Sequence, residues 1–503
     1  MMKHPETERI DELLHIRADQ RADALFLLEG ERSTSYAVAN RITDRIARWL
    51  QRSGVGTGDR VVLLGDNSTD FLLVVFGILR VGATVVPLHA KTPTAVLTQV
   101  LEQAEPIILL ADRPLLDKFL FTQSSTCIAL DELRSLPDGL PTPTKTKAES
   151  ACIIFTSGST GIPQGVICGH GEIMFAIHAI NQVLGQTQDD RILCCLPFSF
   201  DYGLYQSFLA LDAGATLVIA SSQPNPLALP ALLQQHRITG FPLVPSLAVA
   251  LLRSRMLERI RLDTLRYATN TGDLLPIQHV ERLSEQLGGQ VVPMYGLTEC
   301  KRVAIMPLDR LSDKPGSVGL PLPGTRVDLL PDAELVTLGT DVGELLVQGP
   351  HVMKGYWRDP TATANRFRKS TTSDKTTLYT GDLFRRDADG FLFFLGRKET
   401  LIRLGNQVFA PAELEQRLAN LDAVEEVAVI RRTLDTEARV EVFIVTDRLP
   451  KSVQQPVENT LADIFASNSN PFTVHFLKKM PRTLNGKIDR VLLAKVNDAG
   501  ASA

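Results

Sequence analysis

A run of six small residues between two short apolar segments is the feature that most constrains this sequence. The apolar segments are residues 151–155 and 165–168, each with the length and composition of a buried strand. Between them stands Thr156-Ser157-Gly158-Ser159-Thr160-Gly161. Glycines let a backbone approach a ligand and turn successive N–H groups toward one point, and the hydroxyl side chains add donors. The segment therefore predicts a loop that holds the phosphates of a nucleotide.

Two familiar phosphate loops are excluded. The segment does not end in Gly-Lys-Ser/Thr, as a Walker A loop does, and it contains no Gly-x-Gly-x-x-Gly dinucleotide fingerprint. The simpler alternative is a hairpin rich in serine and glycine that binds nothing.

Residues 156–166, TSGSTGIPQGV, resemble the signature of the adenylate-forming enzymes. That superfamily includes acyl-CoA synthetases, the adenylation domains of nonribosomal peptide synthetases, and luciferases. The family usually has lysine where this chain has Gln164. The substitution implies a weaker contact to the departing phosphates, so that other groups carry more of that charge.

The order of apolar and amphipathic segments predicts the fold class. Strands are expected at residues 24–28, 59–64, 85–88 and 106–110, and helices at 35–51, 67–80 and 94–104. This alternation, without hairpin signals, predicts parallel sheets covered by helices. Residues 343–349 and 355–356 are typical of a β-rich subdomain, and a helix at 412–419 followed by strands at 424–430 and 439–446 indicates a small α/β domain.

Composition excludes several classes of protein. The chain has 503 residues, enough for more than one domain, and its net charge of −4 gives no basic surface for nucleic acid. The polar N-terminus predicts no signal peptide, and the most apolar stretch, residues 71–88, is interrupted by Arg80, Gly82 and Pro87, so no membrane span is expected. Six cysteines without a Cys-x-x-Cys pair indicate free thiols in a reducing cytoplasm and no zinc site.

Two further segments extend the resemblance. Residues 294–300, MYGLTEC, are similar to the family's Tyr-Gly-x-Thr-Glu motif, which implies that Tyr295 stacks on adenine, Thr298 contacts the α-phosphate and Glu299 binds Mg²⁺. A carboxylate suits Mg²⁺ on a nucleotide. Residues 379–382, YTGD, imply that Asp382 holds both ribose hydroxyls. The resemblance assigns ATP binding to Thr156, Ser157, Gly158, Ser159, Thr160, Gly161, Asn270, Gly272, Tyr295, Asp382 and Arg397.

The C-terminal region carries the last motif. Residues 481–490, PRTLNGKIDR, resemble the family segment whose lysine bridges the substrate carboxylate and the α-phosphate, a role that falls to Lys487. The resemblance implies an adenylation core at 1–396, a hinge at 397–400 and a mobile domain at 401–503. Within the hinge, Glu399 stands at the pivot position. Gly405-Asn406-Gln407-Val408 departs from the family's usual Ser-Gly-Tyr/His-Arg, which implies an altered lining of the thioester-forming tunnel.

The substrate pocket is predicted from residues 196–205, LPFSFDYGLY. Acyl- and aryl-CoA synthetases usually have histidine where Phe200 stands, whereas amino-acid-activating domains carry Phe-Asp, whose aspartate pairs with the substrate's ammonium group. A buried aspartate among aromatic residues needs such a partner, although Asp201 could instead cap a helix from Gly203. Other residues expected to form the pocket, with core packing as the alternative for the tyrosines, are Tyr202, Tyr205, Pro242, Asn270 and Met294.

The resemblance implies a cytoplasmic ATP- and Mg²⁺-dependent, AMP-forming ligase. The chain looks most like free-standing L-prolyl-AMP ligases of natural-product pathways, and no carrier segment follows the last motif. The expected reaction is activation of an amino acid, most simply L-proline, then thioester transfer to the phosphopantetheine of a separate peptidyl carrier protein, as in nonribosomal peptide synthesis. The alternatives are an acyl-CoA synthetase and a non-catalytic scaffold of the same fold.

Overall fold

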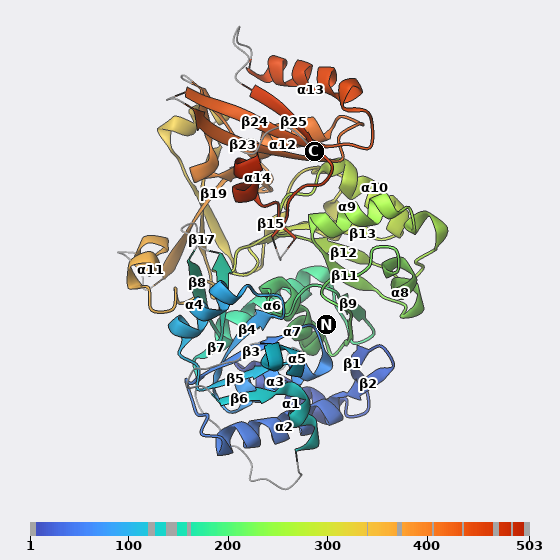
Figure 1. Ribbon diagram of the computed structural model, residues 1–503, viewed down its shortest axis with the longest axis vertical. Coiled ribbons are helices and arrows are strands. Elements are labelled where there is room, and N and C mark those ends of the chain that lie inside the picture. Colours follow the sequence, from blue (N-terminus) through green and yellow to red (C-terminus); the bar gives the residue numbers. More distant parts are fainter. Residues whose placement is uncertain are drawn as a thin grey trace.

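The structure is a computed structural model of the whole chain (Figure 1). It describes residues 7–118, 126–136, 148–157, 162–339, 341–369, 375–404, 407–434, 437–465, 472–483 and 486–496. Of the predicted residues, Gly158, Ser159, Thr160, Gly161, Gly405 and Asn406 lie outside these ranges.

A six-stranded sheet contains the predicted phosphate hairpin at one edge. Its strands lie in the order β6-β5-β3-β4-β7-β8 and are parallel except for the antiparallel pair β7–β8. β3, β4 and β5 are almost wholly buried apolar strands, as expected where helices cover both faces of a sheet. The strands are β3 (Arg60–Gly65), β4 (Thr84–His89), β5 (Ile108–Ala111), β6 (Thr126–Ala129), β7 (Ser150–Ser157) and β8 (Pro163–Gly169).

A nine-stranded sheet follows the order β15-β14-β13-β12-β11-β9-β10-β1-β2. Its central strands are parallel, and antiparallel strands lie at both edges. The strands are β1 (Leu25–Glu29), β2 (Arg32–Ser35), β9 (Arg191–Cys194), β10 (Thr216–Ile219), β11 (Gly240–Leu243), β12 (Tyr267–Asn270), β13 (Gln290–Tyr295), β14 (Ala304–Ile305) and β15 (Leu320–Pro321).

Helices fill the space between and around these sheets. In α7 every residue is buried, and in α3 all but Arg80, so both helices belong to the interior. By contrast, α2 is amphipathic and begins with a Ser35 cap, whose hydroxyl accepts from Val38 N. The helices are α1 (Ile10–Gln20), α2 (Tyr36–Arg52), α3 (Thr69–Arg80), α4 (Thr94–Ala104), α5 (Arg113–Lys118), α6 (His170–Leu184), α7 (Asp201–Ala213), α8 (Leu229–Gln235), α9 (Pro245–Ser254) and α10 (Ile277–Leu287).

The last third of the chain forms smaller sheets, at the top of Figure 1 in yellow to red. The five-stranded sheet, the predicted β-rich subdomain, has the order β16-β17-β19-β18 with β20 paired to β19. Its elements are β16 (Arg326–Leu330), β17 (Val342–Gln348), α11 (Pro360–Arg366), β18 (Phe367–Lys369), β19 (Thr376–Arg386) and β20 (Leu392–Arg397). Beyond it lie β21 (Ile402–Leu404), β22 (Gln407–Phe409), α12 (Pro411–Ala419), β23 (Glu426–Leu434), β24 (Glu437–Val445), α13 (Pro450–Phe465), β25 (Phe472–Leu477) and α14 (Arg490–Val496).

The C-terminal elements have a hydrophobic core of their own. Val429, Val442 and Val457 are among its buried residues, and they pack apart from the large N-terminal core. The α/β fold class is thereby confirmed, and the movement of residues 401–503 as one unit stays a prediction.

One local expectation is wrong, and one alternative is excluded. The alternation of strands and helices in the N-terminal part predicted no hairpin, but β1 and β2 form an antiparallel hairpin. The side chain of Asp201 does not cap a helix, because α7 already begins at this residue with Phe200 at the N-cap and no side-chain cap bond. Among the described helices, none has both the length and the apolar character that crossing a bilayer requires.

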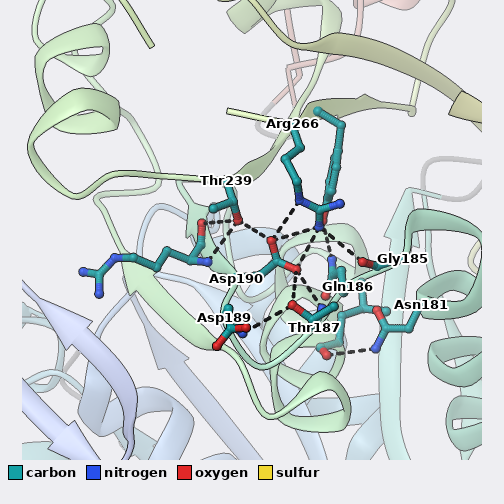
Figure 2. A network of polar contacts seen from close by, with 11 residues as sticks. Asn181, Gly185, Gln186, Thr187, Asp189, Asp190, Thr239 and Arg266 are labelled. Carbon is teal, nitrogen blue, oxygen red and sulfur yellow. Dashed lines mark hydrogen bonds and ion pairs between the residues drawn. The ribbon is translucent and has the colours of Figure 1, made fainter. Parts of the chain in front are cut away.

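A polar network closes the amino ends of β9, β11 and β12 (Figure 2). Its centre is Asp190, which accepts from Thr187 N at 2.7 Å, from the Thr239 hydroxyl at 2.6 Å and from Arg266 Nη2 at 2.8 Å. The adjoining Tyr267 hydroxyl accepts from Gln186 at 2.7 Å. These residues lie before or at the start of a strand, so the network holds this edge of the sheet together.

Candidate active site

One large cavity, of about 2440 Å³, lies at the carboxyl ends of β12 and β13, where the phosphate hairpin and the C-terminal elements converge. In open α/β sheets, ligands bind at this edge of the strands. The cavity brings together most of the described candidate residues: Thr156, Asp201, Tyr202, Asn270, Gly272, Met294, Tyr295, Thr298, Glu299, Asp382, Arg397, Glu399 and Lys487. Tyr205 lines a small adjoining cavity, whereas Pro242 is buried within β11 and lines neither.

A buried carboxylate lies beside Tyr295 at one end of the cavity. The Tyr295 hydroxyl donates to Asp382 Oδ2 at 2.6 Å, and the ring packs against Phe384 and Phe394. Asp382 Oδ1 accepts no hydrogen bond from the described residues, although Arg397 Nε lies 3.4 Å away. Burial raises the pKa of Asp382 against the lowering effect of Arg397. A buried oxygen lacking a donor suits a ligand hydroxyl, as the ribose assignment requires.

Glu299 is held by two residues that lie outside every motif recognised in the sequence. Tyr356 Oη donates to Glu299 Oε1 at 2.7 Å, and Arg366 Nη2 lies 3.9 Å from the same oxygen. The second oxygen, Oε2, receives no hydrogen bond within the described part of the chain. Glu299 lines the large cavity, and a carboxylate oxygen without a described donor there suits a Mg²⁺ ligand, with the metal's remaining ligands coming from substrate and water.

The pocket aspartate already has a cation beside it. Lys301 Nζ lies 3.5 Å from Asp201 Oδ2 and 4.7 Å from the centre of the Tyr205 ring. Burial acts to lower the pKa of Lys301, but Cys168 and Asp201 raise it above its usual value, so the ammonium stays charged. The backbone φ of Lys301 is +59°, a left-handed conformation that costs a non-glycine residue energy and often marks a functional site.

A second cation, Arg302, lies next to this pair. Its Nη1 donates to the Thr271 hydroxyl at 2.8 Å, and its guanidinium stacks over Tyr202 at 5.2 Å. Its Nε is buried without a hydrogen-bond partner among the described residues, and burial lowers the pKa of the guanidinium. Asp201, Lys301 and Arg302 together carry a net positive charge. The sequence signal for this excess of positive charge is the pair of consecutive cations, Lys301 and Arg302, among the otherwise apolar residues 300–306. Neither cation was among the predicted site residues.

Lys487 reaches the cavity from the C-terminal region. Its Cε lies 3.7 Å from the point that a Cβ on Gly272 would occupy. Gly272 has φ +98°, a conformation that L side chains rarely adopt, so glycine is needed in this turn. An ion-pair cluster holds the two regions in contact: Arg253 of α9 lies 2.6 Å from Glu425 and 3.2 Å from Glu426, which also pairs with Arg482.

The described ends of the phosphate hairpin also line the cavity. Thr156 pairs with Gln164 across the β7–β8 hairpin, and the Thr156 hydroxyl donates to the Gln164 carbonyl at 3.3 Å. The Gln164 amide donates to Asp359 Oδ2 at 3.3 Å, so this side chain is directed to the N-cap of α11.

Known proteins share this sequence pattern and architecture. The AMP-binding enzyme family matches residues 14–357. A linear gramicidin synthase of Brevibacillus parabrevis is 29% identical over 97% of this chain, which covers only 6% of that protein. Among solved structures, O-succinylbenzoate coenzyme A synthetase from Bacillus subtilis, in complex with ATP and magnesium ion, has a TM-score of 0.82 and 25% identity over 96% of this chain and 99% of that one. VinN in complex with L-aspartate has a TM-score of 0.70 and 32% identity over 78% of this chain and 100% of that one.

The fold and the cavity are those of an adenylate-forming enzyme. The chain belongs to the AMP-binding enzyme family, whose members are ATP-dependent, AMP-forming ligases that use Mg²⁺ and join an acid to a thiol acceptor.

Proposed function

We propose that this protein activates an amino acid as its aminoacyl-adenylate and transfers it to the phosphopantetheine thiol of a separate carrier protein in the cytoplasm. The observation that carries the proposal is the Asp201 carboxylate, 9% exposed at the cavity wall, with one ion-pair contact as long as 3.5 Å among the described residues. Such a carboxylate has capacity for an incoming ammonium group.

The first step joins the substrate carboxylate to the α-phosphorus of ATP and breaks the bond to the β-phosphate, so pyrophosphate leaves. Lys487 stabilises the charge on the reacting carboxylate and α-phosphate, with Thr298 donating to the same phosphate. Mg²⁺ held at Glu299 supplies charge neutralisation. Asp382 and Arg397 bind the ribose end of the nucleotide, with Asn270, Gly272 and Tyr295 around the base.

In the second step the carrier thiolate attacks the carbonyl carbon and AMP leaves. Lys487 belongs to the C-terminal region and occupies the cavity in this structure, which therefore corresponds to the first step. Rotation of residues 401–503 about Glu399 would withdraw Lys487 and open a path for the thiol. Domain movements of this kind present one site with two sets of groups.

L-Proline is the substrate that the sequence favours. Its secondary ammonium presents two N–H donors to Asp201, and Tyr202, Tyr205 and Met294 limit the size of the pocket without adding a further charge. The support for proline is the resemblance of the FSFDYG and ECKRV segments to L-prolyl-AMP ligases.

A dicarboxylic amino acid is the second candidate, because the pocket contains one more cation than anion. Arg302 has a buried Nε without a described partner, and a substrate side-chain carboxylate would satisfy it while the ammonium met Asp201. The structure of VinN with L-aspartate shows that a protein 32% identical to this chain binds such a molecule.

ATP–pyrophosphate exchange across the amino acids tests the proposal. We expect exchange with an amino acid and none with the corresponding acid that lacks an amine. Highest activity with proline supports the first candidate, and highest activity with aspartate supports the second. Exchange confined to fatty or aryl acids would overturn the amino acid assignment, and no exchange with any acid would favour the non-catalytic scaffold.

The acceptor is tested separately. We expect a labelled thioester on a phosphopantetheinylated carrier protein and little on free CoA. Efficient formation of acyl-CoA with an unlabelled carrier would instead identify an acyl-CoA synthetase.

A further inference from the structure

Residues 353–366 connect three parts of the cavity wall that are far apart in the sequence. Met353 N donates to the Glu299 carbonyl at 2.9 Å, and Trp357 N donates to Gly165 O at 2.7 Å. Tyr356 forms an isolated antiparallel bridge with Val166, so this segment pairs with the outer edge of β8. The segment therefore fixes the main chain around Glu299 relative to β8.

The side chain of Tyr356 adds a direct contact to the carboxylate of Glu299. Its hydroxyl donates to Oε1 at 2.7 Å in a buried setting, while Oε2 has no described donor. The hydrogen bond to Oε1 restricts the rotation of the carboxylate and leaves Oε2 without a described partner.

Arg366 extends the contact to the other end of the nucleotide site. Its Nη1 donates to the carbonyls of Thr380 at 2.7 Å and Tyr379 at 3.3 Å, two and three residues before Asp382. Its Nε lies 3.5 Å from Tyr356 Oη. One guanidinium thus contacts the part of β19 that carries Asp382 and the phenol that holds Glu299.

We propose that Tyr356 and Arg366 are positioning residues for the metal site: Tyr356 orients Glu299 so that Oε2 faces Mg²⁺, and Arg366 sets the separation between Glu299 and Asp382. The proposal rests on the assignment of Glu299 as the Mg²⁺ ligand. It predicts that the pair acts on the Mg²⁺ dependence of nucleotide binding, which a contact with a merely structural role would leave unchanged.

The test is the affinity of the full-length protein for ATP, measured by calorimetry with and without Mg²⁺. Tyr356→Phe should leave the affinity for ATP without Mg²⁺ unchanged. It should reduce the increase in ATP affinity that Mg²⁺ causes, here called the Mg²⁺ gain, by about tenfold, which is the contribution of one hydrogen bond to a charged group. The same variant should raise the Mg²⁺ concentration that gives half-maximal exchange, with the amino acid KM unchanged. Arg366→Gln should reduce the gain in the same direction.

Two controls separate the possible failures. Tyr267→Phe removes another buried, hydrogen-bonded tyrosine hydroxyl, at the amino edge of the sheet, and should leave the Mg²⁺ gain unchanged. Glu299→Gln should abolish the gain, and Tyr356→Phe should then have no further effect. If Mg²⁺ still increases the ATP affinity of both Tyr356→Phe and Arg366→Gln as much as that of the unsubstituted protein, the positioning role is refuted. A full gain in Glu299→Gln would instead refute the assignment of Glu299 itself.

Discussion

Asp190 lies where β9 begins, and Asp201 lies a few residues beyond its end, so two buried carboxylates stand at opposite edges of one sheet. Asp190 is 3% exposed and receives several hydrogen bonds shorter than 3 Å from Thr187, Thr239 and Arg266 (Figure 2). Asp201 has, among the described residues, a single contact of 3.5 Å, to a lysine whose backbone is strained. A carboxylate that is fully bonded stabilises the fold, whereas one that is under-bonded beside a cavity retains the capacity to bind a ligand.

The same contrast applies to the cations at the two edges. Arg266 directs its guanidinium at one acceptor carboxylate, while Arg302 makes one bond to a neutral hydroxyl and keeps a buried Nε without a described partner. A buried cation with an unsatisfied nitrogen costs stability, so its place at the carboxyl edge favours a binding role there. Substitutions at the two edges should therefore separate activity from stability.

The largest effect is expected at Asp201. Asp201→Ala leaves the substrate ammonium without an anion, a loss of about 3–5 kcal/mol that corresponds to a KM increase of about 100-fold or more. Steady-state exchange against amino acid concentration measures it, with the KM for ATP as the internal control. Unchanged activation of acids that lack an amine would show that Asp201 has no substrate role.

Lys487→Ala should have the second-largest effect on activity. Loss of one preformed charge at the reacting atoms should lower adenylation by about 100-fold or more, with little effect on unfolding because the Lys487 side chain is exposed. Thioester formation from preformed adenylate should survive better. An equal loss in both steps would contradict a role confined to the first.

At the opposite edge, Asp190→Asn should affect stability instead of chemistry. The change leaves Arg266 and Thr239 without a charged acceptor and should cost about 1–3 kcal/mol, the scale for hydrogen bonds to a buried charged group, because Arg266 itself is 41% exposed. The midpoint of urea unfolding should fall while the exchange kinetics at 25 °C stay unchanged. A fall in activity without a fall in the midpoint would remove the distinction between the two edges.

The smallest effect is expected from Gln164→Lys, which restores the cation usual in the family. The gain in adenylation rate should be about two- to fivefold, the difference between a neutral and a charged hydrogen bond, because Asp359 would pair with much of the new charge. Pre-steady-state release of pyrophosphate measures it. Asp359→Asn in the same background should increase the gain, and a slower enzyme would show that Gln164 serves another purpose.

The fold was largely predictable because its signals are local. Apolar strands at β3, β4 and β5 and the helices between them follow directly from the pattern of buried residues. The hairpin β1–β2 was missed, since antiparallel pairing at a sheet edge depends on which strands the remaining sheet leaves free.

The site was predictable where residues lie on contiguous motifs, and not where tertiary contacts create it. Thr298, Asp382 and Lys487 stand on recognisable segments, and the cavity brings them together. Tyr356 is 57 residues from Glu299, and nothing local marks it as the partner of that carboxylate. Lys301 enters the pocket only because a left-handed turn directs it inward, and one sequence does not reveal such a conformation.

The Arg253 cluster, which joins α9 to Glu425 and Glu426, has a consequence for how the enzyme responds to its solution. Arg253 and Glu425 are each about one-third exposed, so dissolved ions can screen the attraction between them. The contact holds the C-terminal region where Lys487 reaches the cavity. If the C-terminal region rotates as proposed, raising the ionic strength should weaken this contact and shift the balance away from the arrangement in which Lys487 lies in the cavity.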